Sequence, residues 1–497
     1  MANKHRNTIL LLAIPLLVLA GCQTGNERQQ SSESNSFSSV QAAQKISFAF
    51  ETLQLEQFET KVVLASVTPS ESKISYSSSN TNVATISPTG KILAKSVGSA
   101  SIKANTSFGE ASFMLEVVAP KENKPLNCKK NVYLSLDGKL QEARLGLEGT
   151  YEYSMMDEAV AKIDNTGKIT PVAKGETDLL IKGEGGIALT HIKVADIALT
   201  NPSDWLEMLN AHSIKAKTNP ETGVAYASND PRGYLTKQEI LSAKKSYVLA
   251  KDLDFTGTPY LYKSDFSSDG NRGAFWSDID GAGHTVKNVK FDASMTRQAL
   301  FPVLLNATVE NLAFEKITYN GTDINGGLAV TILSHHNDLQ PDGKSALSTY
   351  STIVRNVSLN LTFSGQYAYG LAPYYYGGRF SNVFIQMKQK DDLPFLGKSA
   401  GLFGDDWLWG FPASASNCIA YVNNESELPD VAAENYAGQH LLRDNVVSST
   451  SKMECLYAAQ SFPTEYWNVS GDHFPLLKQQ GSVFERKVIV HATKLFL

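Results

Sequence analysis

An asparagine recurs in one local pattern along the second half of this 497-residue chain. Each copy has an apolar residue two positions before the asparagine and apolar residues one and three positions after it. The copies are centred on Asn288, Asn311, Asn356, Asn382 and, in a weaker form, Asn417. A short unit that repeats in this way buries its apolar face by stacking on its neighbours, so the pattern predicts the coils of a β-solenoid.

The repeated asparagines have a physical role in such a stack. An asparagine at a bend can hydrogen-bond the asparagine of the coil above and of the coil below, as side chains do in stacked strands. We therefore predict that these five asparagines form a structural ladder. The intervals between them are unequal, which implies insertions in the longer coils. Hairpin strands with surface asparagines are the alternative interpretation.

A second repeat, at one constant offset, lies in the first half of the chain. Short stretches that alternate apolar and polar residues are separated by turns that contain glycine, which predicts short strands packed as a sandwich. The paired positions are Tyr76 with Tyr153, Ile86 with Ile163, Gly90 with Gly167 and Gly98 with Gly175. The register therefore indicates two copies of one all-β unit.

The first copy, residues 45–119, resembles the group 2 bacterial Ig-like domain. The resemblance rests on Tyr-Ser-Ser-Ser-Asn from Tyr76, Val-Ala-Thr-Ile from Val83 and Gly-Lys-Ile from Gly90. The second copy, residues 120–197, resembles that domain more loosely. In this family the domains usually act as spacers or adhesive modules on bacterial surfaces, and the motif positions are mostly framework.

Residues 245–425 resemble the GLUG-motif repeats of bacterial surface proteins. The matching segments are Tyr-Val-Leu-Ala-Lys-Asp-Leu-Asp from Tyr247, Asp-Gly-Ala-Gly-His from Asp280 and Gly-Leu-Phe-Gly from Gly401. The resemblance implies a right-handed parallel β-helix. Helical spacing after Asn201 adds a short N-terminal helical cap. The expected fold is all-β, with Ig-like β-sandwiches at 45–119 and 120–197, a β-helix at 198–480 and a C-terminal tail or cap at 481–497.

The N-terminus carries a positive segment, then a short apolar run from Ile9 to Ala20, then Leu-Ala-Gly-Cys ending at Cys22. The run is too short for a spanning helix, which needs about 20 residues. The Leu-Ala-Gly-Cys segment resembles the bacterial lipobox, which implies a signal peptide at 1–21 and lipid attachment at Cys22. An ordinary secretory peptide is the alternative. Two acyl chains would hold the protein on the extracytoplasmic face of a membrane, with the polar segment 22–44 as a disordered tether.

Composition excludes several classes of function. The net charge of −5 with no basic cluster argues against nucleic acid as a partner. There is no nucleophile elbow, phosphate loop or zinc-protease motif, so we expect no cofactor, no metal and no catalytic residue that can be named.

Beyond Cys22, the cysteines are Cys128, Cys418 and Cys455. Buried free thiols are the favoured interpretation, and a Cys418–Cys455 disulfide is the alternative.

Two groups of polar residues are candidate chemical sites. Enzymes with β-helix folds that cleave acidic polysaccharides use clustered carboxylates, and Asp252, Asp254, Asp278 and Asp280 are candidates. The repeat pattern explains three of them, all but Asp278, as turn and framework residues. The segment His335-His336-Asn337-Asp338 contains metal-ligand residue types, but adjacent side chains in a loop seldom converge on one ion.

The aromatic runs are the candidate ligand-binding residues: Tyr374, Tyr375, Tyr376, Trp407 and Trp409. Neighbours on a strand alternate faces, so three consecutive tyrosines cannot all enter one core. Aromatic rings with polar tips provide platforms for sugars or for a protein partner, although core and turn packing is the alternative. We expect a surface binding or adhesion protein for an extracellular glycan or surface protein. A polysaccharide lyase or glycoside hydrolase, and a purely structural surface protein, are the alternatives.

Overall fold

The computed structural model describes residues 44–480, apart from 121–123, 185, 227–232, 263–270, 293, 322–324, 335–350, 365–367, 391–401, 403–412, 424–440 and 471–472. The described part consists mainly of β-strands, which confirms the predicted all-β class. Within it, no helix has both the length and the apolar character needed to span a bilayer.

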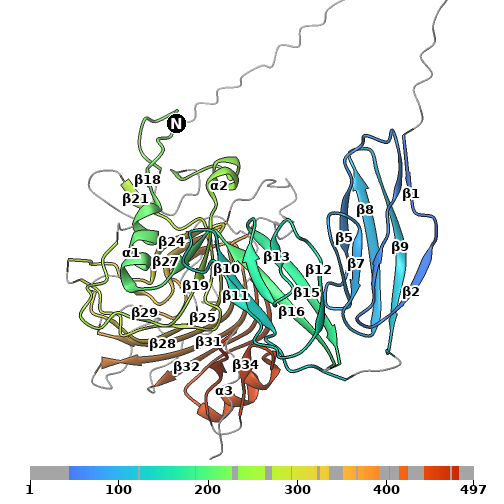
Figure 1. Ribbon diagram of the computed structural model, residues 1–497. Coiled ribbons are helices and arrows are strands. Elements are labelled where there is room, and N and C mark those ends of the chain that lie inside the picture. The colour runs from blue at the N-terminus through green and yellow to red at the C-terminus, as the bar shows by residue number, and fades with distance from the viewer. Residues whose placement is uncertain are drawn as a thin grey trace, which may run out of the picture.

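The first sandwich, blue in Figure 1, has a four-stranded sheet in the order β2-β9-β8-β5 and a three-stranded sheet in the order β3-β7-β6. On β9, Phe113, Leu115 and Val117 are buried and alternate with exposed residues, which directs one face into the core. Its strands are β1 Lys45–Ser47, β2 Thr52–Glu56, β3 Thr60–Val62, β4 Ser66–Thr68, β5 Ser75–Ser78, β6 Ala84–Ile86, β7 Lys91–Ala94, β8 Gly98–Thr106 and β9 Gly109–Val118.

The second sandwich repeats the strand order of the first, as β10-β16-β15-β12 and β11-β14-β13. The paired glycines explain why the sequence repeat is strict. Gly98 has φ +145° and Gly175 has φ +155°, and a Cβ at either would press against Val83 or Val160 respectively. The strands are β10 Asn131–Ser135, β11 Ala143–Arg144, β12 Tyr151–Met155, β13 Ala161–Ile163, β14 Lys168–Pro171, β15 Gly175–Gly183 and β16 Gly186–Ala195.

A stack of parallel strands follows the second sandwich. Its main path runs β17-β19-β22-β25-β28-β31-β32-β33, and β20 and β23 pair beside it. Every pair along this path is parallel. The strands are β17 Ile197–Leu199, β19 Ser246–Leu249, β20 Leu253–Asp254, β22 Asp278–Asp280, β23 Thr285–Lys287, β25 Thr308–Tyr319, β28 Ile353–Phe363, β31 Gly378–Gln389, β32 Ala413–Asn423 and β33 Leu441–Ser449.

Further parallel strands face this stack across the largest apolar core. On β31, Val383, Ile385 and Met387 enter that core, whereas Phe384 points to the other face. Along the chain, strands of the main stack alternate with strands of the facing sheets, on opposite sides of this core. The facing strands are β24 Phe301–Leu305, β27 Ala329–Leu333 and β30 Tyr374–Tyr376 in one sheet, and β26 Asn325–Gly326 with β29 Ala368–Tyr369 in another.

Short helices pack around the stack. In α1, Pro202–Ala211, the Asn201 side chain accepts from the Asp204 N–H and caps the helix, and Trp205 is fully buried. In α2, Lys237–Ala243, Thr236 and Glu239 form a capping box. The other elements of this part are β18 Ser213–Lys215 and β21 Asn271–Gly273, which pair with each other.

The described C-terminal segment covers the outer face of the stack and then turns back along it. It contains α3 Lys452–Ala458, η4 Ala459–Ser461, β34 Trp467–Asn468 and β35 Leu476–Leu477. Trp467 is buried against Phe384 and Phe462. The Gln480 N–H then donates to the Ala282 carbonyl, so residue 480 lies near the start of the stack, beside the second sandwich.

Candidate functional site

A column of asparagines runs through the stacked strands. The amide of Asn356 donates to the side-chain oxygen of Asn311 at 2.9 Å, that of Asn382 to Asn356 at 3.1 Å, and that of Asn417 to Asn382 at 3.1 Å. Each of these residues has φ between +50° and +53°. Asparagine tolerates this left-handed conformation better than most residues. The same bend is therefore repeated from coil to coil, with one amide above the next.

Both ends of the column are closed by other polar groups. At one end the Asn311 amide donates to the Asp280 carboxylate at 3.2 Å. At the other end Asn445 donates to Asn417 at 3.0 Å and also to the Ser461 hydroxyl. The sequence pattern missed Asn445, because Arg443 and Ser448 stand where the other copies have apolar residues.

Asn288 is not part of this column, contrary to the prediction. It follows β23 at a second bend, where its backbone N–H donates to the Glu315 carbonyl and its side-chain amide donates to the Asp254 carboxylate at 2.8 Å. In the coil before Asn311, the residue at the same bend is Ala282, which also has a left-handed φ of +50°. The motif around Asn288 copies the apolar spacing, but it lies at a different corner of the coil.

Two of the tyrosines predicted to bind ligand are buried. Tyr375 is 1% exposed in the large core, and Tyr376 is also 1% exposed. Alternation along β30 does direct Tyr376 away from that core, but Tyr234 and Trp276 cover the outer side. The half-buried Tyr374 packs against the same outer cluster. Burial therefore removes Tyr375 and Tyr376 from the predicted aromatic platform. Trp407 and Trp409 lie outside the described residues.

The four candidate carboxylates are all engaged in the framework. Asp252 accepts from the Thr285 N–H and contacts His284, and Asp254 accepts from the Thr256 N–H. Asp278 pairs with Lys244 at 2.8 Å. These contacts fix turns and strand ends. His335 and His336 lie outside the described residues. Among the residues that are described, no three His, Cys, Asp or Glu side chains gather to hold a metal ion.

The three described cysteines are free thiols. Cys418 and Cys455 are fully buried, and burial raises the pKa of each to about 12. Their thiols are therefore protonated and unreactive at neutral pH.

The junction between the two sandwiches is held by apolar and polar contacts. Leu93 of the first sandwich packs with Met156 and Leu180 of the second. The Lys91 ammonium donates to the Ser154 hydroxyl at 2.8 Å and to the Met155 carbonyl at 3.0 Å. These apolar and polar contacts hold the two domains against each other. Figure 1 shows the second sandwich between the first sandwich and the stack.

A chain of alternating charges begins at this junction. Lys95 of the first sandwich pairs with Asp178 at 3.1 Å, and Asp178 contacts Nδ1 of His191 at 3.0 Å. The other ring nitrogen of His191 lies 3.6 Å from Glu176. Burial opposes protonation of His191, but its bonds to Asp178 and Glu176 outweigh burial and raise the pKa to about 9. His191 is therefore an imidazolium at neutral pH.

The same chain of charges continues into the stack through Lys193. Its ammonium lies 2.7 Å from Asp280 and 2.6 Å from Glu310, whose side chains are 3% and 6% exposed. Glu310 also pairs with Arg355 of β28. Burial opposes ionisation of Glu310, but Lys193 and Arg355 outweigh it and lower its pKa. We call this set the junction network; its members are Lys95, Glu176, Asp178, His191, Lys193, Asp280, Glu310 and Arg355.

The second sandwich also covers the exposed edge of the stack. The Ala198 N–H of β17 donates to the Asp137 carboxylate at 3.1 Å, and the Lys139 ammonium donates to the Ala198 carbonyl at 3.1 Å. An uncovered edge strand is a template for pairing with another chain. Asp137 and Lys139 occupy these edge groups and tie the two domains together.

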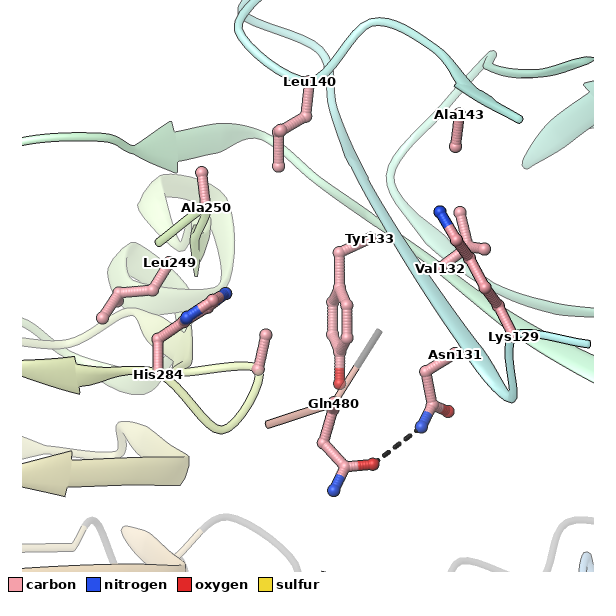
Figure 2. Close-up of a pocket in the computed structure, with 11 residues that line it drawn as sticks. Lys129, Asn131, Val132, Tyr133, Leu140, Ala143, Leu249, Ala250, His284 and Gln480 are labelled. Atoms are coloured by element: carbon pink, nitrogen blue, oxygen red, sulfur yellow. Dashed lines mark hydrogen bonds between the residues drawn. The ribbon is translucent and has the colours of Figure 1, made fainter. Parts of the chain in front are cut away.

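A pocket of about 260 Å³ lies at this second junction. Figure 2 shows the Tyr133 ring at its centre, with His284 on one side and Lys129 and Asn131 on the other. The amide of Asn131 donates to Gln480 at 2.8 Å. The lining residues come from the second sandwich, the first coils and the end of the described chain: Lys129, Asn131, Val132, Tyr133, Leu140, Ala143, Leu249, Ala250, Ala282, His284 and Gln480. No local motif could have revealed a site assembled from such distant segments.

Comparison with known proteins supports the first sandwich. Residues 42–111 match the bacterial Ig-like domain (group 2), which confirms the resemblance for the first copy. No curated protein sequence matches the chain.

Several solved structures are similar to part of the chain. Domains 4 and 5 of the S-layer protein SbsC match at 14% identity over 31% of this chain and 98% of that chain, with a TM-score of 0.14. Human protocadherin-24 EC1-2 matches at 13% identity over 31% and 98%, with a TM-score of 0.14. SbsC domains 1–6 match at 18% identity over 24% of this chain and only 20% of that chain, with a TM-score of 0.12. Likenesses at these TM-scores do not bear on function.

Proposed function

We propose that this chain is a lipid-anchored binding or adhesion protein of the bacterial cell surface. A diacylated Cys22 holds it on the extracytoplasmic face of a membrane, and the polar segment 22–44 separates the anchor from the first domain. The ligand is an extracellular glycan or a surface protein. The match of residues 42–111 to a bacterial Ig-like domain supports an extracellular surface location.

The stacked strands form a right-handed parallel β-helix in this proposal. Parallel pairing from β17 to β33, the facing parallel strands and the column of side-chain amides support a coil that advances by one strand per turn. Such stacks present long faces that suit extended partners. The helix is thus the recognition domain, and the sandwiches connect it to the tether.

The junction network is the observation that carries this proposal. Spacers that move independently need few contacts, whereas here Lys95 and Lys193 extend paired charges across both junctions. Preorganisation lowers the entropy lost on binding. The two sandwiches and the β-helix therefore act as one rigid arm that presents a binding site at a fixed distance from the end of the tether.

The binding claim is tested with residues 23–497, which lack the signal peptide and the lipidated Cys22, on an array of bacterial and host glycans and on immobilised surface-protein extracts. Reproducible, saturable binding to members of one class supports a binding protein. A matched control is the pair of sandwiches alone, residues 44–197, which is expected to bind much more weakly. Equal binding by that pair would assign recognition to the sandwiches, and depolymerised glycan after incubation would instead support an enzyme.

A further inference from the structure

We propose that the pocket at the junction of the second sandwich and the stack binds one neutral sugar ring, the end unit of a glycan. This inference rests on the proposed surface-binding function and places its site at the end of the β-helix that faces the second sandwich, where residues of that sandwich complete it. It replaces the aromatic run on β30, whose Tyr375 and Tyr376 are buried.

The position and size of the pocket suit a single ring. Binding sites occur preferentially at domain interfaces, and pockets for drug-sized ligands measure about 300–1,000 Å³. At about 260 Å³, this pocket lies just below that range. A chain of several sugars does not fit, but an end unit can enter while the rest of the glycan remains in solvent.

The Tyr133 ring supplies the apolar platform in this pocket. It is half-buried, and Figure 2 shows its hydroxyl directed toward Gln480. Burial, together with the nearby Asp280 and Glu310 carboxylates, raises the pKa of Tyr133. The hydroxyl is therefore protonated over the whole physiological range and can both donate and accept a hydrogen bond. A sugar ring presents the matching groups, with an apolar C–H face and hydroxyls at its edge.

The polar groups around Tyr133 favour a neutral polyhydroxyl ligand over an ion. Lys129 lines the pocket, and its ammonium is a donor for a hydroxyl oxygen. Nδ1 of His284 lies 3.2 Å from the Asp252 carboxylate, so the other ring nitrogen, Nε2, remains to bond a ligand hydroxyl. The Lys129 ammonium disfavours a cation. Asp280 and Glu310 are paired with Lys193, but they still raise the pKa of Tyr133 and so act against an anion at that ring.

The test uses residues 23–497 and a panel of methyl glycosides of glucose, galactose, mannose and N-acetylglucosamine, with glucuronic acid as an anionic comparison. Titration followed by NMR is expected to show saturable binding of at least one neutral glycoside. Tyr133→Phe removes one hydroxyl and keeps the ring, and Lys129→Met removes the ammonium. Each is expected to raise Kd about five- to tenfold, the range for one lost hydrogen bond.

Two matched variants control for general effects. Tyr151→Phe removes a hydroxyl that bonds Glu148 elsewhere on the same sandwich, and Lys130→Met removes an exposed ammonium beside Lys129. Both are expected to leave Kd unchanged. If Tyr133→Phe lowers the melting temperature, the Kd of Lys129→Met for the neutral glycosides is the result that tests the pocket.

The possible outcomes separate this inference from the proposed function. Array binding that both pocket variants leave intact would place the site elsewhere and overturn the inference while the binding function stands. Preference for glucuronic acid, or no saturable binding of any neutral glycoside, would also overturn it. An array and surface-protein extracts that retain nothing would contradict the binding function itself.

Discussion

The side-chain amide of Asn356 donates to the side-chain oxygen of Asn311 at 2.9 Å, although 45 residues separate the two in sequence. The Asn356 oxygen in turn receives the Asn382 amide at 3.1 Å and faces the Trp467 indole N–H at 3.4 Å. One buried side chain therefore connects two neighbouring coils and the covering C-terminal segment.

Replacing Asn356 with alanine is expected to destabilise the stack by about 1–3 kcal/mol, the cost of leaving buried polar partners unpaired. The matched control is Asn288→Ala, because Asn288 has a similar φ of +60° but lies outside the column. Urea unfolding of residues 23–497 should show the larger loss for Asn356→Ala. Equal losses would attribute the effect to the left-handed backbone alone.

Replacing Lys193 with methionine is expected to cost about 3–5 kcal/mol, because Asp280 and Glu310 would remain buried without their shared cation. Lys103→Met is the control, since Lys103 pairs with Glu110 at the surface, where such pairs contribute about 0–1 kcal/mol. Chemical unfolding measures both. A loss below 1 kcal/mol for Lys193→Met would mean that water or another cation compensates the carboxylates.

The junction network also predicts a pH dependence. The pKa of His191 is raised to about 9 in the folded protein, against about 6.5 in an unfolded chain. The folded state holds this proton more tightly, so the stabilisation is complete below pH 6.5 and is lost as the pH rises through 9. Because the His191 side chain is 39% exposed, solvent weakens the effect.

Melting temperatures measured between pH 6 and pH 10 test this dependence. The wild type is expected to lose more stability over that interval than His191→Gln, which cannot titrate. Parallel curves for the two proteins would show that His191 does not contribute.

Lipid attachment at Cys22 follows from the Leu-Ala-Gly-Cys segment. Cells given a labelled fatty acid should label the wild type, whereas Cys22→Ala should stay unlabelled and retain its N-terminal segment. Cys128→Ala is the control and should remain labelled. Label on Cys22→Ala equal to that on the wild type would contradict the lipobox interpretation.

The sequence predicted those features that depend on local chemistry. Gly98 and Gly175 begin the equivalent strands β8 and β15 with positive φ, where a Cβ would press against a valine, so the repeat was visible as a pattern. The column of Asn311, Asn356 and Asn382 has a similar local cause, since each bend requires a left-handed residue with an amide. Such requirements involve only a few neighbouring residues, so they produce a recurring spacing of glycines or asparagines in the sequence.

The features that the sequence did not reveal depend on distant segments. Tyr376 points away from the large core, as alternation requires, but Tyr234, from a distant segment, packs over it. Lys193 pairs with Glu310 because the second sandwich packs against the stack. The pocket likewise needs Tyr133, from one domain, and Gln480, from the end of the described chain. Contacts of this kind have no spacing that a sequence pattern could detect.

The central claim is that the two sandwiches and the stack form one rigid arm. Pulsed electron resonance between spin labels at Lys103, whose side chain is 43% exposed, and at the exposed Tyr457 measures it most directly, because these sites lie in the first sandwich and in α3. The account predicts one narrow distance distribution in the wild type, which broadens when Lys193→Met and His191→Gln are combined. A broad distribution in the wild type would contradict the account.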